Sequence, residues 1–293
     1  MAVDKYAHLS PFSERDIENR FSHWYDNIKN CGIAMPETVV TKIPADIQRA
    51  FYMEHPDDRS AVRAWLNEYV MPALVENKLT GLLFIKNAVF SGKFDAVRNC
   101  FCLSDVDHLT DNIINIMQGA ACMIMGYDGF DEIVIRRWLD HDPAHTPCMY
   151  NGLPLRPEFR VFYDFDIHDV IFVANYWDHD YVYPNLYDIT DKIIFASMRS
   201  HIETEFLLNK DHVADLVREH MKDITGLTGP WSIDIMKNDD GEFYLIDMAV
   251  AEQSAYWDYR PGNEENLAAE RARRRDDERR RDAIASNIIE PVE

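Results

Sequence analysis

The sequence predicts an α+β fold of two lobes, preceded by a short helical region, and three observations lead to this prediction. The chain has 293 residues, which is enough for two lobes with sizeable cores. Residues 231–248 alternate apolar and polar side chains on both sides of an Asp-Gly turn, which is typical of a β-hairpin. Residues 81–118 are in turn typical of a strand, a loop, a second strand and a helix.

Composition restricts the class of protein. Hydrophobic residues make up 47% of the chain, as expected for a globular protein. No apolar run approaches the roughly 20 residues of a membrane-spanning helix, so we expect no membrane partner. The N-terminus carries no apolar region, so we expect no signal peptide. The five cysteines are scattered and form no CxxC pair, which indicates a reducing compartment and a cytoplasmic protein.

The formal net charge of −21 argues against a general nucleic-acid surface, because phosphate binding needs clustered Lys and Arg. Seven Arg and seven acidic residues lie between Glu264 and Asp282, and this balance predicts a solvated helix rather than an RNA-binding patch. We therefore expect no nucleic-acid partner. A local basic pocket for one nucleotide is compatible with the charge, and so is a basic protein partner.

The first elements follow from helical spacing and from two residues that break helices. Residues 10–30 carry apolar side chains at helical spacing and predict a helix. Gly32 ends this helix, and Pro36 prevents its continuation. Thr38–Val40 then begins a strand, and residues 58–76 predict a second helix by the same spacing.

Residues 81–89 predict a buried strand that contains a single lysine, Lys86. A lysine with apolar neighbours needs an anion or a route to solvent, so Lys86 is a candidate anion-binding residue. The loop that follows holds a second lysine, Lys93, for which an exposed loop position is the alternative. Residues 97–103 then predict a strand, and residues 107–118 predict a helix.

Two strands with arginine residues and a long helical region follow, over residues 133–139, 158–162 and 189–222. Arg136 and Arg137 are adjacent, so their side chains point to opposite faces of the strand and at most one faces a ligand directly. The alternative for one of them is an exposed position on an edge strand. Arg160 shares a strand face with Glu158, and an ion pair with Glu158 or Asp164 is the alternative to a ligand-binding role.

The hairpin places an acid in each of its strands. Alternation predicts that Asp234 faces away from Ile233, and that Asp247 shares a face with Leu245 and Ala249. The hairpin could bring the two carboxylates side by side, where they repel unless a cation lies between them. Hard oxygen ligands suit Mg²⁺ carried in on a nucleotide. A surface hairpin with two solvated acids is the alternative.

An acid in a strand, a turn with Gly, and a second acid thirteen positions later resemble the metal-binding hairpin of the ATP-grasp superfamily. That superfamily usually ends the motif with acid-x-Asn, whereas this chain has Ala249 at the Asn position. Glu252 or Gln253 is the candidate replacement ligand. The Gly-Ile-x-x-Pro-x-Thr step that begins at Gly32 is also similar to the start of many ATP-grasp domains.

The segment from Leu82 to Asp258 resembles one branch of this superfamily in particular. Ile-Arg-Arg-Trp at 135–138, Pro-Glu-Phe-Arg-Val-Phe at 157–162 and the hairpin are similar to the eukaryotic cell-division-cycle family of assembly chaperones for translation initiation factor two, with its bacterial and phage relatives. Those chaperones have a Gln-Arg-Asp step where this chain has Asn-Tyr-Trp-Asp at 175–178. This difference leaves the partner or substrate open.

The resemblance implies an ATP-grasp fold with ATP and Mg²⁺ between two lobes. It divides the chain into an N-terminal helical region with its following strand, a small nucleotide-gripping lobe, a large lobe and a charged helical tail, over residues 1–40, 41–135, 136–258 and 259–293. It implies catalytic roles at the phosphates for Arg160 and Lys86. It implies further nucleotide contacts from Ser91, Gly92, Lys93, Arg136, Arg137, Trp138 and Leu139, and metal ligation by Asp234, Asp247 and Glu252.

The activity implied by the resemblance is ATP-dependent ligation of a carboxylate to an amine through an acyl phosphate. The substrate is then a small molecule or a peptide. The alternative is a non-catalytic ATP-binding protein that grips a protein partner, as the chaperone branch does. Modification of a nucleic acid is disfavoured by the charge of the chain.

Overall fold

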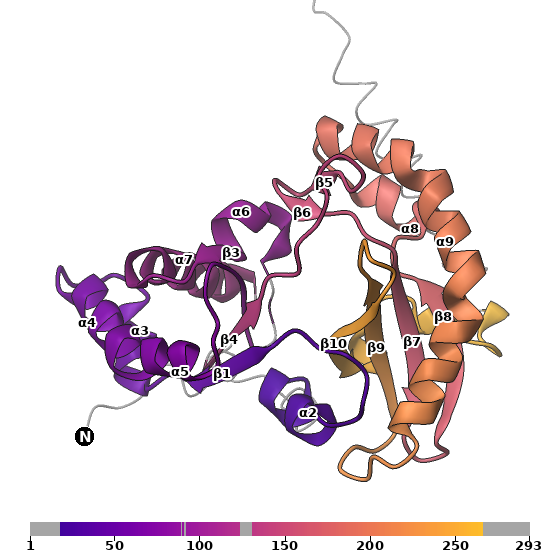
Figure 1. Ribbon diagram of the computed structural model, residues 1–293, viewed down its shortest axis with the longest axis horizontal. Coiled ribbons are helices and arrows are strands. Elements are labelled where there is room, and N and C mark those ends of the chain that lie inside the picture. The colour runs from indigo at the N-terminus through magenta and orange to yellow at the C-terminus, as the bar shows by residue number, and fades with distance from the viewer. Residues whose placement is uncertain (1–17, 89, 91, 124–130, 266–293) are drawn as a thin grey trace, which may run out of the picture.

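The structure is a computed structural model, and it describes residues 18–265 apart from residues 89, 91 and 124–130 (Figure 1). Two four-stranded antiparallel sheets organise these residues. The first sheet has the order β1 (Thr38–Lys42), β4 (Glu132–Arg137), β2 (Leu82–Asn87), β3 (Phe101–Leu103). The second sheet has the order β10 (Phe243–Val250), β9 (Pro230–Lys237), β7 (Glu158–Asp164), β8 (Asp169–Asn175). A small hairpin pairs β5 (Cys148–Met149) with β6 (Leu153–Pro154).

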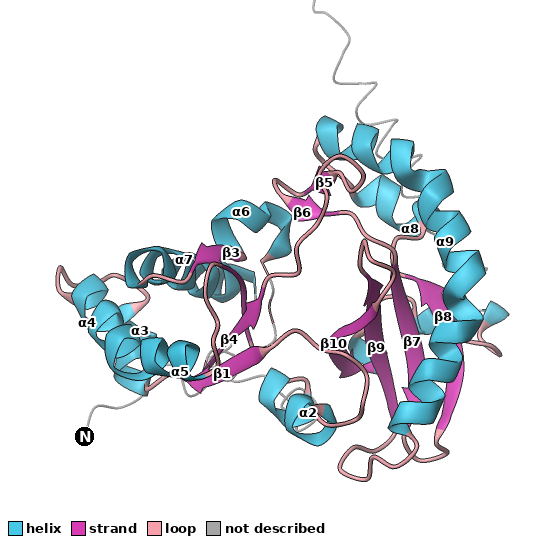
Figure 2. Cartoon of the chain, in the orientation of Figure 1, coloured by secondary structure: helices cyan, strands magenta, loops and turns pink. Residues whose placement is uncertain are grey.

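Helices cover these sheets, so the predicted α+β class is confirmed (Figure 2). They are α2 (Phe21–Ile28), α3 (Ala45–Ala50), α4 (Asp58–Trp65), α5 (Met71–Glu76), α6 (Ala96–Asn99), α7 (Val106–Met123), α8 (His179–Val182) and α9 (Ile189–Met221). A π-helical segment, η2 (Leu66–Val70), lies between α4 and α5, and short 3₁₀ helices are η3 (Lys93–Asp95), η4 (Tyr183–Asn185), η5 (Ala251–Gln253) and η6 (Trp257–Tyr259). Within the described residues, no helix is both long enough and apolar enough to cross a membrane.

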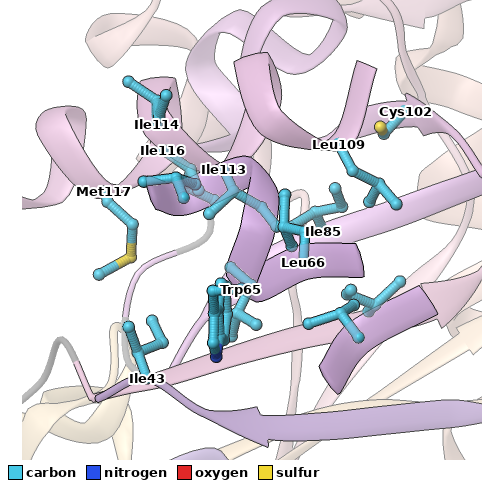
Figure 3. Close-up of a cluster of buried hydrophobic side chains, with 14 of the residues drawn as sticks. Ile43, Trp65, Leu66, Ile85, Cys102, Leu109, Ile113, Ile114, Ile116 and Met117 are labelled. Atoms are coloured by element: carbon cyan, nitrogen blue, oxygen red, sulfur yellow. The ribbon is translucent and has the colours of Figure 1, made fainter. Parts of the chain in front are cut away.

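One core lies between the first sheet and the helices beside it (Figure 3). The helix predicted over residues 58–76 is confirmed as α4, η2 and α5, which follow one another without a break. Its Trp65 and Leu66 pack with Ile85 of β2 and Ile113 of α7, and all four are buried. Each such side chain contributes about 1.5–3 kcal/mol on burial, so this core fixes β2 in place.

A second core lies between the second sheet and helices α2 and α9. The predicted hairpin is confirmed, and Trp231 and Ile233 of β9 point into this core as the alternation indicated. Val213 and Val217 of α9 meet them, one helical turn apart. The opposite face of β9 is left to Asp234 and its neighbours.

The strand predicted over residues 97–103 is wrong in its first half, where the chain forms α6. The backbone N–H groups of Ala96 and Val97 donate to the carbonyls of Tyr150 and Asn151, at 2.9 and 3.1 Å. These bonds satisfy donors that the first turn of a helix leaves without partners. The hairpin of β5 and β6 therefore holds α6, and only Phe101–Leu103 is left to pair with β2.

Gly32 makes the turn that connects α2 to the sheets. α2 covers part of the helix predicted over residues 10–30, and residues 10–17 lie outside the described residues. Gly32 has a φ of +99°, in the left-handed region that favours glycine. Beside it, His220 Nδ1 of α9 donates to the Cys31 carbonyl at 2.9 Å.

The segment after Gly32 joins the two sheets. Ala34 forms a parallel bridge with Tyr244, and the Leu245 N–H donates to the Ala34 carbonyl at 2.9 Å. The chain then enters β1 at Thr38. One short segment therefore covers the outer edge of β10 and continues into the first sheet.

We predict that Gly32→Ala lowers the free energy of unfolding by about 2–3 kcal/mol, combining left-handed strain with a steric clash. An alanine Cβ would lie 2.7 Å from His220 Nδ1. Gly81→Ala is the matched control, because Gly81 has a φ of +81° with no atom within 4 Å of the added Cβ. The control should lose only about 1–2 kcal/mol. Urea unfolding measures both losses, and equal losses would show that the His220 contact has no effect.

Candidate functional site

A cavity of about 150 Å³ lies between the two sheets. Its charged lining residues are five cations, Lys86, Lys93, Arg136, Arg137 and Arg156, and three acids, Glu158, Asp234 and Asp247. Its other lining residues are Pro36, Phe84, Trp138, Leu139, Leu153, Pro154, Tyr176, Trp177, Met236 and Ile246. Cations outnumber acids here although the chain carries a net charge of −21, so the local potential favours an anion.

The structure brings most of the predicted site residues to this cavity. Eight of them line it: Lys86, Lys93, Arg136, Arg137, Trp138, Leu139, Asp234 and Asp247. Gly92 has a φ of +63° and turns the loop into Lys93, whereas Ser91 lies outside the described residues. Glu252 does not reach the cavity lining, since the chain leaves β10 and turns into η5, where this side chain is exposed. Gln253 instead accepts a hydrogen bond from Asn19.

The two hairpin acids face each other because of a β-bulge. The register of β9 and β10 shifts by one residue between Leu245 and Asp247, which makes Asp247 the partner of Asp234. Ile246 is the extra residue, and both Ile246 and Asp247 line the cavity while Leu245 is buried in the second core. The prediction that Asp247 shares a face with Leu245 is therefore wrong, because the bulge interrupts the alternation of β10.

Each hairpin acid is paired with a cation of the chain. Lys86 Nζ donates to Asp247 Oδ2 at 2.7 Å, so the anion that Lys86 needs is Asp247. Arg160 does not itself line the cavity, and it donates to both carboxylate oxygens of Asp234, which does, at 2.8 and 2.7 Å. The alternative ion pair of Arg160 with Glu158 or Asp164 is therefore wrong, because its partner is Asp234. Burial lowers the pKa of Arg160, but the charge and hydrogen bonds of Asp234, together with Tyr176 and Glu158, raise it overall.

Tyr176 lies between Lys93 and Arg160, and no role was predicted for it. Lys93 Nζ donates to the Tyr176 hydroxyl and lies 4.4 Å from the ring centre. The Arg160 guanidinium lies 4.7 Å from the same ring. The available signal was the Asn-Tyr-Trp-Asp step at 175–178, where the chain departs from the family pattern.

Burial controls the charge state of Glu158, which also lines the cavity. Burial raises the pKa of Glu158 to about 8, although Lys93 and Arg160 act in the opposite direction. Burial lowers the pKa of Lys93, but Tyr176 and Glu158 raise it overall, so the ammonium stays charged. Glu158 therefore takes up a proton more readily than an exposed carboxylate does, and its charge depends on the cations beside it.

Arg136 and Arg137 point to opposite faces of β4, as expected. Arg136 is buried, and it donates from Nε to Thr38 Oγ1 at 3.1 Å and from Nη1 to the Ile246 carbonyl. Burial lowers the pKa of Arg136 to about 10. Arg137 donates to Glu37 Oε2 at 2.7 Å. The alternative of an edge-strand position is wrong, because β4 is an interior strand of the first sheet, and both arginines contribute to the cavity wall.

Arg156 is a second residue without a predicted role. It is buried, and Nη2 donates to the carbonyls of Leu139, at 3.1 Å, and Asp140. Its Nε lies 3.4 Å from Asp239 Oδ1, and Asp239 also accepts from Thr146 Oγ1 at 3.0 Å. Arg156 and Asp239 therefore anchor the segment between the sheets to the turn of the hairpin.

The carboxylates of the cavity fit a metal ion that arrives with a phosphate ligand. Among the described residues, no group of three or more His, Cys, Asp and Glu side chains is placed to hold a metal ion. Mg²⁺ commonly takes one or two carboxylates and completes its six ligands with phosphate oxygens and water. Asp234 and Asp247, opposite each other on the hairpin, fit a Mg²⁺ ion that arrives on a nucleotide and do not fit a freestanding metal site.

We predict that Asp234→Asn destabilises the unliganded protein more than Asp247→Asn does. The Arg160 and Asp234 side chains are 13% and 8% exposed, so losing one charge leaves the other buried and unpaired, at a cost of about 3 kcal/mol. The Lys86 side chain is 6% exposed, but it loses only one hydrogen bond in Asp247→Asn, and water can reach the 38% exposed Asp247 position and replace that bond, so the cost should be about 1.5 kcal/mol.

Urea unfolding without metal and nucleotide measures both changes. The control is Asp211→Asn, since the Asp211 side chain is 88% exposed and its ion pair with Lys210 is near the surface. Equal effects at Asp234 and Asp247 would contradict the ranking.

Comparisons with known proteins agree with the architecture. No protein-family model and no curated protein sequence matches the chain. Among solved structures, C-terminally truncated Cdc123 from Schizosaccharomyces pombe matches with a TM-score of 0.51 and 15% identity, covering 83% of this chain and 89% of that chain. Cdc123 from the same yeast matches with a TM-score of 0.48 and 16% identity, covering 83% of this chain and 89% of that chain. VanG D-Ala:D-Ser ligase from Enterococcus faecalis matches with a TM-score of 0.40 and 11% identity, covering 80% of this chain and 53% of that chain.

At such low identity the likeness concerns the fold alone, and the first of these matches carries it. Two antiparallel sheets with a cavity between them, and the hairpin motif of the sequence, agree with that likeness. The chain has the ATP-grasp fold.

Proposed function

We propose that the protein binds ATP together with Mg²⁺ in the cavity between the two sheets. The main support is the charge of the cavity, where five cations oppose three acids in a chain of net charge −21. An excess of cations against the overall charge favours a ligand with several negative charges, such as a triphosphate. The aromatic and aliphatic lining, which includes Phe84 and Trp138, suits a flat base.

Under this proposal the cations divide the phosphates between them. Lys86 and Lys93 hold phosphate oxygens from the first sheet and its loop, and Arg160, which lies beside the cavity lining and is paired with Asp234, holds them from β7. An arginine suits this position because its fork binds two oxygens at once. Asp234 and Asp247 hold Mg²⁺, which, when bound, neutralises charge on the phosphates.

We propose that the reaction is ligation of a carboxylate to an amine. The substrate carboxylate oxygen attacks the γ-phosphorus, the bond to the β-phosphate oxygen breaks, and ADP leaves. The amine nitrogen then attacks the carbonyl carbon of the acyl phosphate, the bond from that carbon to the phosphate oxygen breaks, and phosphate leaves with the proton that the amine loses as the amide forms. Lys86 and Arg160 offset the charge that develops on the transferred phosphoryl group, and no side chain acts as nucleophile. The substrate is a small molecule or a peptide.

A non-catalytic role is the second candidate, and the hairpin provides the observation that favours it. Ala249 occupies the position where a third metal ligand is expected, and Glu252 lies away from the cavity lining. A site with fewer ligands holds the metal less rigidly, which disfavours phosphoryl transfer more than binding. In this case Mg·ATP acts as a conformational ligand, and the functional partner is another protein.

We predict that Lys86→Met weakens the binding of Mg·ATP by roughly 1.5–3 kcal/mol, the contribution of a charge-assisted hydrogen bond. Isothermal titration calorimetry measures the affinity. Lys210→Met is the matched control, because Lys210 pairs with its neighbour Asp211 on α9 and is absent from the cavity lining. An unchanged affinity in a folded Lys86→Met variant would remove Lys86 from the nucleotide site.

We predict that the protein forms ADP from Mg·ATP only when an acceptor carboxylate and an amine are present. Amino acids and peptides labelled with ¹⁸O in their carboxylates provide the pool, and mass spectrometry follows the products. Ligation through an acyl phosphate transfers one ¹⁸O atom to the released phosphate. Tight ATP binding with no ADP above the Lys86→Met background would instead support the non-catalytic candidate.

A further inference from the structure

The bulge in β10 needs a hydrogen-bond donor from outside its own hairpin. A β-bulge leaves its extra residue without a partner in the ladder, and here that residue is Ile246. A buried carbonyl without a donor costs free energy. Arg136 Nη1 donates to the Ile246 carbonyl, and this bond spans from the first sheet to the second.

Arg136 is itself held firmly. Its residue is 3% exposed, its Nε donates to Thr38 Oγ1 on β1, and its guanidinium lies 5.3 Å from the ring centre of Phe21. A planar guanidinium donates in two directions at once, which a lysine ammonium at the end of a flexible stem does less rigidly. The donor at Ile246 is therefore fixed by the first sheet and does not depend on the hairpin.

Lys86 and Arg136 act on consecutive residues of β10. Lys86 lies on β2 and pairs with Asp247, while Arg136 lies on the neighbouring β4 and bonds to Ile246. The first sheet thus contacts both the extra residue of the bulge and the carboxylate that follows it.

A regular register would remove Asp247 from the cavity. On the turn side of the bulge, Leu245 pairs with Ile235. If β10 continued in that register without a bulge, Ile246 would lie opposite Asp234, and Asp247 would lie opposite Ile233. Since a one-residue slip moves side chains to the other face, Asp247 would then point toward the core.

We infer that Arg136 is a positioning residue, which holds the Ile246 bulge so that Asp247 faces Asp234 and lines the cavity. This inference rests on the proposed function in one respect, namely the use of Asp247 as a ligand for nucleotide-borne Mg²⁺. It gives Arg136 a role through the backbone of β10, distinct from the nucleotide contact that the family resemblance implies.

The test compares ATP affinity with Mg²⁺ and with EDTA, by calorimetry, in the wild type and in Arg136→Gln. The Mg²⁺ gain, defined as the ATP affinity with Mg²⁺ divided by the affinity with EDTA, should be about 10–100-fold smaller in the variant, as is typical when a residue that orients a metal ligand is removed. Because Arg136 is one of the five cations of the cavity, its loss should lower the affinity for ATP with and without Mg²⁺ alike, so the positioning role is measured by the ratio of the two affinities. Arg136→Lys keeps the charge and should lose part of the gain, which provides a milder variant.

Deletion of Ile246 is the rescue. Without the extra residue, β10 alternates regularly, with Leu245 toward the core and Asp247 opposite Asp234, so no donor is needed at the bulge. Arg136→Gln in this background should retain the Mg²⁺ gain of the deletion variant. Arg199→Gln, which removes an exposed arginine that pairs with Glu203 on α9, controls for loss of an arginine in general.

Hydrogen exchange of β10 without any ligand separates this inference from the proposed function. Arg136→Gln should accelerate amide exchange at residues 246–248, and the deletion should abolish that acceleration. Unchanged exchange would overturn the positioning role. Where the wild type shows a Mg²⁺ gain, an unchanged gain in Arg136→Gln, or an equal loss of the gain in the deletion background, would overturn it as well. A wild type whose ATP affinity is indifferent to Mg²⁺, with the exchange result as expected, would overturn the proposed function and leave the positioning role standing.

Discussion

Charges held away from water between the two sheets are the constraint on which the rest of this structure depends. An ion taken into a protein interior loses several kcal/mol of hydration unless a partner offsets it. Arg160 and Asp234 satisfy this within the second sheet, whereas Lys86 and Asp247 satisfy it between the sheets. In the unliganded protein, these two ion pairs are therefore satisfied by the chain's own side chains, while the cavity lining keeps its excess of cations. Under the proposed function, Mg·ATP binds by partner exchange: phosphates take the cations while the metal takes the carboxylates.

The N-terminal segment supports this arrangement from behind the cavity. Asn19 Oδ1 accepts from the Val250 N–H at 2.6 Å, which ties the segment to the end of β10. The ring of Phe21 is fully buried, and its centre lies 5.6 Å from Lys86 Nζ and 5.3 Å from the Arg136 guanidinium. Two cations are thus held close to one buried aromatic ring. A segment far from the hairpin in sequence thereby helps to set the geometry at the bulge.

Much of the fold could be predicted because its signals are local. The helical spacing over residues 58–76 and the alternation around the Asp-Gly turn each reflect the period of one element, and both elements form as expected. The prediction over 97–103 failed because the donors of α6 are satisfied by Tyr150 and Asn151, which a local pattern does not contain. The family resemblance added the arrangement of the two sheets, which periodicity alone does not provide.

For the candidate site too, part could be predicted from local sequence and part depended on contacts between distant segments. The sequence by itself determined which charged residues are unusual in their strands, since Lys86, Asp234 and Asp247 each interrupt an apolar run. Only the tertiary structure decided their partners and the direction in which Asp247 points. The alternation of β10 predicted the wrong face for Asp247, because a bulge depends on a donor for its extra residue. That donor is Arg136, 110 residues earlier in the chain, and it reaches Ile246 only after the two sheets have come together.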